Sequence, residues 1–481
     1  MRTVSRDSLM QLLDDAADSF VVQEKNGKFG IESLRDAVEA YGRLLTSSGV
    51  TPLDRVVVKL SRSYLDLAAI FGVIAVGGIA VPVGAETPPD RLSMIADNCC
   101  AVGAALTNDL RVGFERYVSL RAEDAAMTVS LDDVALMIYT SGSSGVPKGV
   151  VCSHSAVLSA VEGIQERLGY LKTDRIGLVL PMAFDYGLYQ GFLALRAGAE
   201  LYIYEEAANG PRLGNRLKSD GITVLPSLPV LTTGLVSWSQ RRHIKLDQIR
   251  LLTSTGADFT EHLAMKAREV MPRARVVPMY GLRECKRATI HDGRPHAPHN
   301  SGRAIKGCQI EIRDESEHAL PAGEVGEIVV IGGNVMKGYW PLDDGALNER
   351  FGVTSDGERF VRTGDKGYLD LNGGLYVLGR TDDMFKIRGY RTSVGEIEDS
   401  LLAITGVYQA CVQPPLDGLP FTALYEGELT PVDLRSRLSA GLELNKIPDV
   451  ILKVDSLPIS ANGKLDRNRI MSDMREGKYI A

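Results

Sequence analysis

The sequence has few cysteines, and it lacks the spacings that bind zinc or form a disulfide framework. Its 481 residues include six cysteines, and none of them stands in a C-x-x-C pair. The first twenty residues carry four aspartates and no apolar segment, so no secretory signal is expected. We therefore expect a protein of a reducing compartment, the cytoplasm.

An uninterrupted apolar run and an excess of basic charge are also missing. The longest apolar stretch, 67–85, is divided by Gly77, Gly78 and Pro82, so a buried helix followed by a strand is expected there and not a membrane helix. The net charge of −7 argues against nucleic acid as a general partner. Three histidines in the segment 291–299 match no standard zinc spacing. We therefore expect no membrane, nucleic-acid or zinc partner.

Length and patterning predict an α/β protein with more than one domain. Helix-like and strand-like patterns alternate over most of residues 1–278, which is typical of mostly parallel sheets with helices on their faces. Beyond Gly302, short strands separated by Gly and Asp turns predict a β-rich subdomain. We predict a large N-terminal domain over 1–381 and a small, mobile α+β domain over 382–481. Helices are expected at 33–45, 65–76, 88–97, 211–218, 261–270, 396–403 and 431–442.

One stretch has the composition of a phosphate-binding loop. An apolar run at 134–139 predicts a buried strand, and a Gly/Ser segment and Lys148 follow it. Glycines let successive backbone N–H groups turn toward one anion, hydroxyls add donors, and the lysine adds a cation. The spacing is not that of a Walker A loop. The residues predicted to surround phosphate here are Thr140, Ser141, Gly142, Ser143, Ser144, Gly145 and Lys148.

Four more strings follow this loop in order: YGLRE at 280–284, RTGD at 362–365, GRTDDMFKIRGYRTSVGEIE at 379–398 and LPISANGKLDR at 457–467. Together the five resemble the motifs of the adenylate-forming superfamily, which includes acyl-CoA synthetases, peptide-synthetase adenylation domains and luciferases. Two serines in the loop stand where threonines are more usual. The resemblance implies ATP-dependent activation of a carboxylate as an acyl-adenylate with release of pyrophosphate, followed by acyl transfer to a thiol.

The resemblance also assigns roles to single residues. Lys464 matches the catalytic lysine, a cation that would stabilise charge growing on the α-phosphate. Glu284 matches the glutamate that positions Mg²⁺, an ion that prefers hard oxygen ligands. Asp382 matches the hinge of the small domain, and Gly389 the path of a phosphopantetheine arm. ATP and Mg²⁺ are the cofactors that the resemblance implies.

The other nucleotide positions follow in the same way. Asp365 would accept bonds from the ribose hydroxyls, and Tyr280 would offer an aromatic face to adenine. Arg283 stands where the family normally has threonine, so a cation replaces a hydroxyl near the phosphates. The remaining positions assigned to ATP or AMP are Gly256, Ala257, Gly281 and Arg380.

The acid that is activated depends on PMAFDYGLYQGF at 181–192. Its Asp185 matches the aspartate that pairs with the substrate ammonium in amino-acid adenylation domains, and it equally matches a D-x-G-L string of fatty acyl-AMP ligases. A buried carboxylate without a substrate cation needs a partner from the protein. The pocket positions predicted from the motifs are Asp185, Tyr186, Tyr189, Leu228, Thr253, Thr255, Met279 and Arg287, which suggests a modest, partly polar pocket.

Three functions are compatible with these residues. The first is a stand-alone enzyme that adenylates a small amino acid and loads a separate carrier protein, and this is the one we expect. The second is an acyl-CoA synthetase or acyl-AMP ligase for a non-amino acid. The third is a non-catalytic scaffold, against which Lys464, Asp365 and the loop argue. No carrier domain is recognisable, so the thiol acceptor is expected to be a separate carrier protein or CoA.

Overall fold

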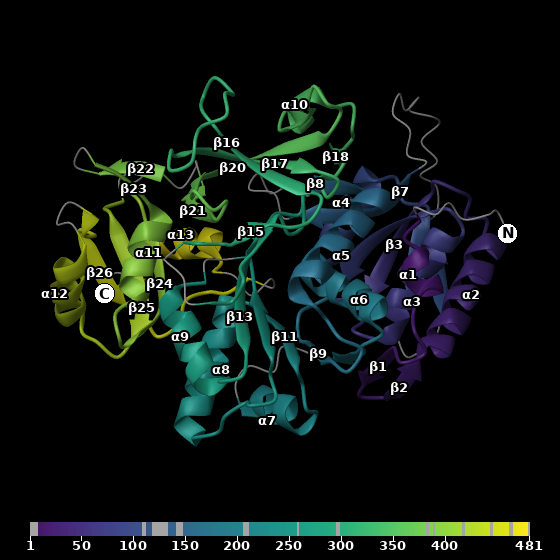
Figure 1. Ribbon diagram of the computed structural model, residues 1–481, viewed down its shortest axis with the longest axis horizontal. Coiled ribbons are helices and arrows are strands. Elements are labelled where there is room, and N and C mark those ends of the chain that lie inside the picture. Colours follow the sequence, from purple (N-terminus) through teal and green to yellow (C-terminus); the bar gives the residue numbers. More distant parts are fainter. Residues whose placement is uncertain are drawn as a thin grey trace.

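A computed structural model of the chain gives the architecture (Figure 1). It describes residues 8–107, 112–117, 133–140, 148–204, 211–256, 259–294, 299–380, 384–387, 390–415, 419–442, 446–460 and 465–479. Within these ranges, helices and strands alternate through the first two thirds of the chain, as the patterning predicts. No helix among the described residues is both long enough and apolar enough to cross a bilayer.

A sheet of seven strands carries the edge at which the glycine-rich loop begins. The strands next to β3 and β4 run parallel, whereas β8 returns antiparallel to β7. In spatial order the strands are β18 (Gly338–Trp340), β8 (Lys148–Ser153), β7 (Val134–Thr140), β4 (Ile79–Gly84), β3 (Arg55–Leu60), β5 (Gly103–Leu106) and β6 (Gly113–Arg116). The apolar stretch 67–85 forms the buried helix α3 (Tyr64–Ala75) and then β4, as predicted.

A second sheet has nine strands, and two of the predicted acid-binding positions, Thr253 and Met279, lie on it. Its central strands β9 to β13 are parallel, as βαβ connections require. In spatial order the strands are β15 (Arg303–Ala304), β14 (Thr289–Ile290), β13 (Arg275–Tyr280), β12 (Leu251–Ser254), β11 (Val224–Ser227), β9 (Arg175–Leu178), β10 (Glu200–Ile203), β1 (Val21–Glu24) and β2 (Gly27–Gly30).

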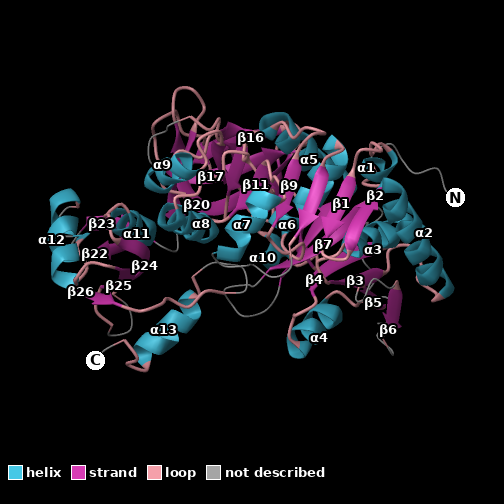
Figure 2. Cartoon of the chain, turned by 90° about the horizontal axis from the view of Figure 1, so that it is seen from below, coloured by secondary structure: helices cyan, strands magenta, loops and turns pink. Residues whose placement is uncertain are grey.

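The two large sheets share one apolar core, and the strands of both are visible edge-on in Figure 2. The core takes residues from strands of both sheets and from the helices α2 (Ile31–Ser47), α3, α5 (His154–Leu168) and α6 (Asp185–Ala197). The other helices of this part are α1 (Gln11–Asp14), α4 (Pro89–Asn98), α7 (Pro211–Ser219), α8 (Pro229–Arg242) and α9 (Glu261–Val270). Layers of helix and sheet around buried apolar side chains are the architecture that alternating patterns predict.

The β-rich subdomain predicted after Gly302 is present. Antiparallel strands build it around a core of its own. They are β16 (Cys308–Arg313), β17 (Gly326–Gly332), β20 (Arg359–Leu369), β19 (Phe351–Val353) and β21 (Leu375–Arg380), with the short helix α10 (Gly345–Asn348) nearby.

The last elements gather at one end of the molecule, drawn yellow-green at the left of Figure 1. Their three-stranded sheet and helices bury a separate apolar cluster. These elements are β22 (Met384–Ile387), β23 (Tyr390–Ser393), α11 (Val394–Leu402), β24 (Val407–Gln413), β25 (Thr422–Gly427), α12 (Pro431–Gly441), β26 (Val450–Lys453) and α13 (Arg467–Arg475).

Helices α6 and α8 were not among the predicted helices. In α6, Gly187 and Gly191 weaken the helical pattern of the sequence, yet both are needed for packing. A Cβ on Gly187 would lie 2.2 Å from the carbonyl oxygen of Pro181, and one on Gly191 would lie 2.7 Å from Leu67.

Candidate active site

The strands that flank the glycine-rich loop form an antiparallel pair, in which Thr140 faces Lys148. The strands on the two sides of 141–147, where a phosphate-binding loop was predicted, thus run in opposite directions. The predicted residues Ser141, Gly142, Ser143, Ser144 and Gly145 lie outside the described residues, and so does the side chain of Thr140. Lys148 is described, and it begins β8.

Tyr339 connects Lys148 to the predicted Mg²⁺-positioning residue, Glu284. The Lys148 ammonium lies over the Tyr339 ring, 5.4 Å from its centroid, and the Tyr339 hydroxyl donates a hydrogen bond to Glu284 Oε1. Burial, aided by the negative charge of Glu284, raises the pKa of Tyr339 well above its ordinary value, so the hydroxyl keeps its proton. The backbone N–H of Met336 donates to the Glu284 carbonyl oxygen at 2.8 Å, which anchors the backbone at that residue.

Tyr339 is not among the residues predicted from the sequence. Nothing in the sequence around it marks a site, because its place arises from the pairing of β18 with β8. A carboxylate that Tyr339 links to the lysine after the predicted phosphate-binding loop has the oxygen chemistry that Mg²⁺ prefers. The described residues contain no group of three or more His, Cys, Asp and Glu side chains that could hold a metal by themselves.

Tyr280 and Asp365 meet on the nucleoside side of the site. The Tyr280 hydroxyl donates to Asp365 Oδ2 at 2.6 Å, between the end of β13 and the middle of β20. Burial, together with the Asp365 charge, raises the pKa of Tyr280 well above its ordinary value, so Tyr280 is a stable donor. The backbone N–H of Asp365 donates to the Thr363 hydroxyl at 3.1 Å. Tyr280 thus orients a carboxylate, and its predicted contact with adenine stays a prediction.

The other predicted nucleotide positions are spread over neighbouring turns. Arg380 pairs with Asp365 across β20 and β21, but its side chain lies outside the description. Gly256 follows β12 with a φ of 89°, a conformation that favours glycine. Its neighbour Ala257 is outside the described residues. At Gly281 a Cβ would lie 1.7 Å from the carbonyl oxygen of Lys286, so the turn 281–287 requires glycine there for packing.

A pocket lies beside the start of α6. Its lining residues are Ile164, Leu168, Asp185, Tyr186, Tyr189, Gln190, Leu193, Met279, Lys286 and Arg287. Five of the eight predicted acid-binding positions are among them. The other three are Thr253, whose hydroxyl bonds that of Tyr186 at 2.7 Å; Thr255, buried after β12; and Leu228, the N-cap of α8.

Four of the lining residues that sequence reasoning missed lie on helices. Gln190 and Leu193 share a face of α6 with Tyr186 and Tyr189, at the spacing of three and four residues that a helix produces. Ile164 and Leu168 come from α5. A prediction of α6 as a helix would have grouped its four residues.

Asp185 has a cation from the protein itself. Arg287 Nη1 lies 3.5 Å from Asp185 Oδ2, and both side chains are largely buried. Burial alone would raise the pKa of Asp185, but Arg287, Lys286 and Arg283 outweigh burial and lower it below its ordinary value. The carboxylate is therefore ionised and paired before any substrate ammonium arrives. This differs from the expectation that the substrate provides the partner.

Lys286 is the strongest addition to the predicted site. Only 1% of it is exposed, and its backbone has a φ of 59°. Its ammonium donates to the carbonyl oxygen of Arg283 at 2.8 Å and lies 5.7 Å from the ring centroid of Tyr189. Arg287 lies over Tyr186 in a similar way, at 4.7 Å. The pocket thus places two buried cations on two tyrosine rings.

Three predicted residues lie outside the described part of the chain: Lys464, Asp382 and Gly389. The strands β22 and β23 pair antiparallel on either side of 388–389. Near Lys464, Ile459 forms an antiparallel bridge with Leu465.

Comparison with known proteins gives one family. The sequence model described as AMP-binding enzyme matches residues 16–340. Tyrocidine synthase 1 of Brevibacillus parabrevis is 29% identical over 96% of this chain and 45% of its own length. A dimodular nonribosomal peptide synthase of Bacillus subtilis (strain 168) is 29% identical over 91% of this chain and 19% of its own length. The chain therefore spans less than half the length of these curated relatives.

Solved structures share the fold over the whole chain. The anthranilate CoA ligase AuaEII, in complex with anthranoyl-AMP, has a TM-score of 0.84 at 19% identity and 98% coverage of both chains. ATP-bound MatB from Rhodopseudomonas palustris has a TM-score of 0.81 at 23% identity, covering 98% of this chain and 99% of its own. These likenesses agree with the α/β architecture expected from the sequence.

Proposed function

This chain belongs to the AMP-binding enzyme family and is an AMP-forming ligase, and from that premise we propose that it activates a small carboxylic acid as an acyl-adenylate. Two contacts support the proposal: Tyr339 joins Lys148 to Glu284, and Tyr280 donates to Asp365, the residue that we expect to hold the ribose. The acyl group then passes to a phosphopantetheine thiol of a separate carrier protein or of CoA. The enzyme acts in the cytoplasm.

In the proposed reaction, each step depends on particular residues. A substrate carboxylate oxygen attacks the α-phosphorus, the bond to pyrophosphate breaks, and negative charge grows on the α-phosphate oxygens. Lys464 stabilises that charge, and Asp365 holds the ribose hydroxyls. When bound, Mg²⁺ neutralises phosphate charge near Glu284. Residues 1–381 form the large domain, and residues 382–481 turn about Asp382 to present Lys464 first and the Gly389 loop afterwards.

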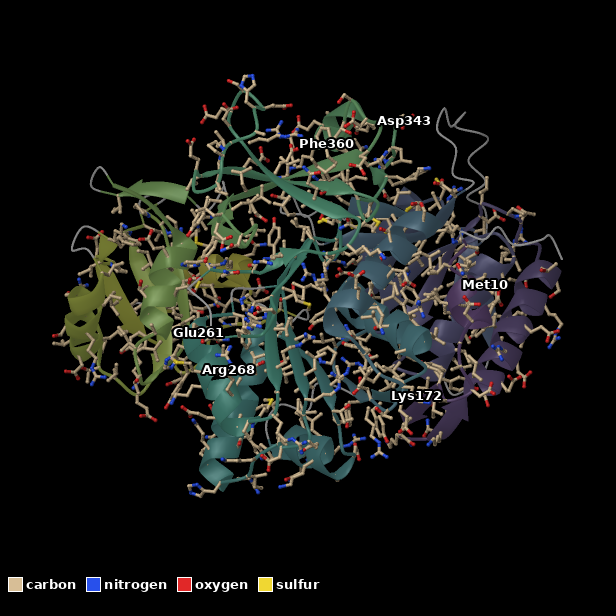
Figure 3. All side chains as sticks on the ribbon, in the orientation of Figure 1. Met10, Lys172, Glu261, Arg268, Asp343 and Phe360 are labelled. Atoms are coloured by element: carbon tan, nitrogen blue, oxygen red, sulfur yellow. The ribbon has the colours of Figure 1, made fainter. Side chains whose placement is uncertain are left out.

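The first test is Lys464→Ala in an ATP–pyrophosphate exchange assay. Removing one well-placed electrostatic contact commonly costs roughly 10²–10³ in rate, and exchange should fall at least that far while ATP binding stays nearly intact. Lys172→Ala, at an exposed lysine labelled in Figure 3, is the matched control. Exchange near the wild-type rate in the Lys464 variant would remove Lys464 from the mechanism.

The ion pair between Asp185 and Arg287 indicates which kind of acid the enzyme activates. A carboxylate that already has a buried guanidinium gains less from a substrate ammonium, and Lys286 repels one. The geometry therefore supports a non-amino acid better than the amino acid that we expected from the sequence. The amino acid stays a second candidate, because the curated relatives include peptide synthases and because Asp185 lies at the first residue of α6, inside the pocket.

The deciding comparison is pyrophosphate exchange with amino acids and their des-amino analogues, in wild type and in Asp185→Ala. We expect wild type to prefer the des-amino acids. A preference for an amino acid, lost in the variant by about 3–5 kcal/mol in apparent specificity, would establish the second candidate, because that is the usual penalty for stranding one partner of a buried pair. Thioester yield with CoA and with a holo-carrier protein then identifies the acceptor.

A further inference from the structure

The acid pocket has more buried positive charge than its neighbours balance. Lys286 is 1% exposed and Arg287 is 6% exposed, and both line the pocket. Arg283 is close enough to lower the pKa of Asp185 together with them. Against these three cations, the same region supplies two carboxylates, Asp185 and Glu284, and Glu284 is bonded to Tyr339 on the phosphate side.

Among the described residues, the groups that Lys286 contacts directly are neutral, although Asp185 is close enough for Lys286 to lower its pKa. These neutral groups are the carbonyl oxygen of Arg283 and the ring of Tyr189, whose own buried hydroxyl has no hydrogen-bond partner among the described residues. An ammonium has three donors, and burying it without an opposite charge is costly. Lys286 and Tyr189 together therefore present donors that a bound anion would use.

Arg287 also has N–H donors that make no hydrogen bond within the described residues. Both of its hydrogen bonds among the described residues come from Nη1, at 3.5 Å to Asp185 and 3.4 Å to the carbonyl oxygen of Lys286. A guanidinium carries five N–H donors in a planar fork that matches a carboxylate in two-point contact. The long Asp185 contact leaves most of this fork available.

We propose that the acid activated by this enzyme carries a second carboxylate, which binds between Lys286 and Arg287 at the end of the pocket. The inference rests on the proposed activation of a small carboxylic acid. A second carboxylate makes the charges of this region equal, and two buried cations that line the pocket are arranged to hold it. The two tyrosine rings already carry cations on their faces, which disfavours stacking of an aromatic substrate ring there.

The probes are malonate, succinate and glutarate, each compared with its monocarboxylate of equal length and with its monoamide. We expect at least one dicarboxylate to support pyrophosphate exchange with kcat/KM roughly 10- to 100-fold above both analogues, the range that one or two charge-assisted hydrogen bonds give. A monocarboxylate or a monoamide that equals or exceeds every dicarboxylate overturns the proposal.

Lys286→Met keeps the length of the side chain and removes its charge. The ratio of kcat/KM for the dicarboxylate to kcat/KM for the monocarboxylate should fall by roughly tenfold or more, mainly through KM for the dicarboxylate. Arg287→Lys should retain part of the preference, and Lys172→Met, at the exposed lysine of Figure 3, should change nothing. Because a purely structural role of Lys286 would lower exchange with all acids together, an unchanged preference in Lys286→Met overturns the proposal.

Calorimetric titration separates this proposal from the proposed function. If no acid of any kind supports exchange, the proposed function fails, and binding of the three dicarboxylates to the intact protein still decides the inference. Binding in wild type that is lost in Lys286→Met, with an unchanged melting temperature, supports the second-carboxylate site. Absence of dicarboxylate binding to wild type in both assays overturns it.

Discussion

Single residues connect parts of the site that are far apart in the sequence, and Tyr280 is the clearest case. Its hydroxyl donates to Asp365 at 2.6 Å. We predict that Tyr280→Phe raises KM for ATP about 5- to 30-fold, because a buried hydrogen bond to a charged group contributes about 1–2 kcal/mol. Exchange kinetics against ATP concentration measure the effect. Tyr376→Phe, at a stacked tyrosine of the neighbouring strand, is the matched control, and equal KM values in the two variants would contradict the prediction.

Single residues also show how much of the site can be predicted from the sequence. It predicted that a buried Asp185 needs either a substrate ammonium or a cation from the protein. It could not choose Arg287, which is 102 residues away and meets Asp185 only through the turn that Gly281 permits. Lys286 was missed for the same reason, since a lysine in a charged segment normally points to water. Tyr339 lies beyond prediction because strand pairing alone brings it to Lys148.

At the scale of elements, helix α3 depends on a buried cap. Asp66 is fully buried, and its carboxylate accepts from the backbone N–H groups of Ser61 and Arg62, each at 2.9 Å, and of Ser63 at 3.3 Å. We predict that Asp66→Ala lowers the free energy of unfolding by about 1–3 kcal/mol, because it leaves buried donors unsatisfied. Urea unfolding measures this change.

Asp90→Ala is the matched control for that measurement. Asp90 also lies in the first turn of a helix, α4, but its side chain is exposed, so the loss should stay within about 0.5 kcal/mol. An equal effect in the two variants would mean that the buried cap of α3 has no special role.

Elements with regular patterns were predicted to within a few residues. The helix expected at 33–45 is α2, and the helix expected at 431–442 is α12. Helix α6 was missed because two of its glycines serve close packing against Pro181 and Leu67 and hide the helical pattern. Packing between distant segments thus overrides local propensity where the pocket is built.

At the scale of the whole molecule, the order of five motifs predicted an adenylate-forming enzyme, and the family match over 16–340 confirms the family. The division into two domains stays a prediction, and it has its own test. Gly389→Trp should block acyl transfer and spare adenylation, because the proposed thiol path needs a residue without a side chain.

Pyrophosphate exchange and thioester yield are measured side by side for this variant. Gly345→Trp controls for the bulk of the indole, because Gly345 is exposed and a Cβ there would meet no atom within 4 Å. Equal loss of both activities in Gly389→Trp would mean that this loop does not line the path of the thiol.

The placement of β18 has an optical consequence. The chain has two tryptophans. Trp238 is 2% exposed in the core beside α7 and α8, whereas Trp340 ends β18, donates to the carbonyl oxygen of Asn98 at 2.8 Å, and has the Arg55 guanidinium 5.7 Å from its ring centroid. Because β18 pairs with the strand that begins at Lys148, Trp340 emission reports on the phosphate end of the site. Residues 382–481 contain no tryptophan, so a movement of that segment changes emission only as far as it alters the surroundings of Trp238 or Trp340.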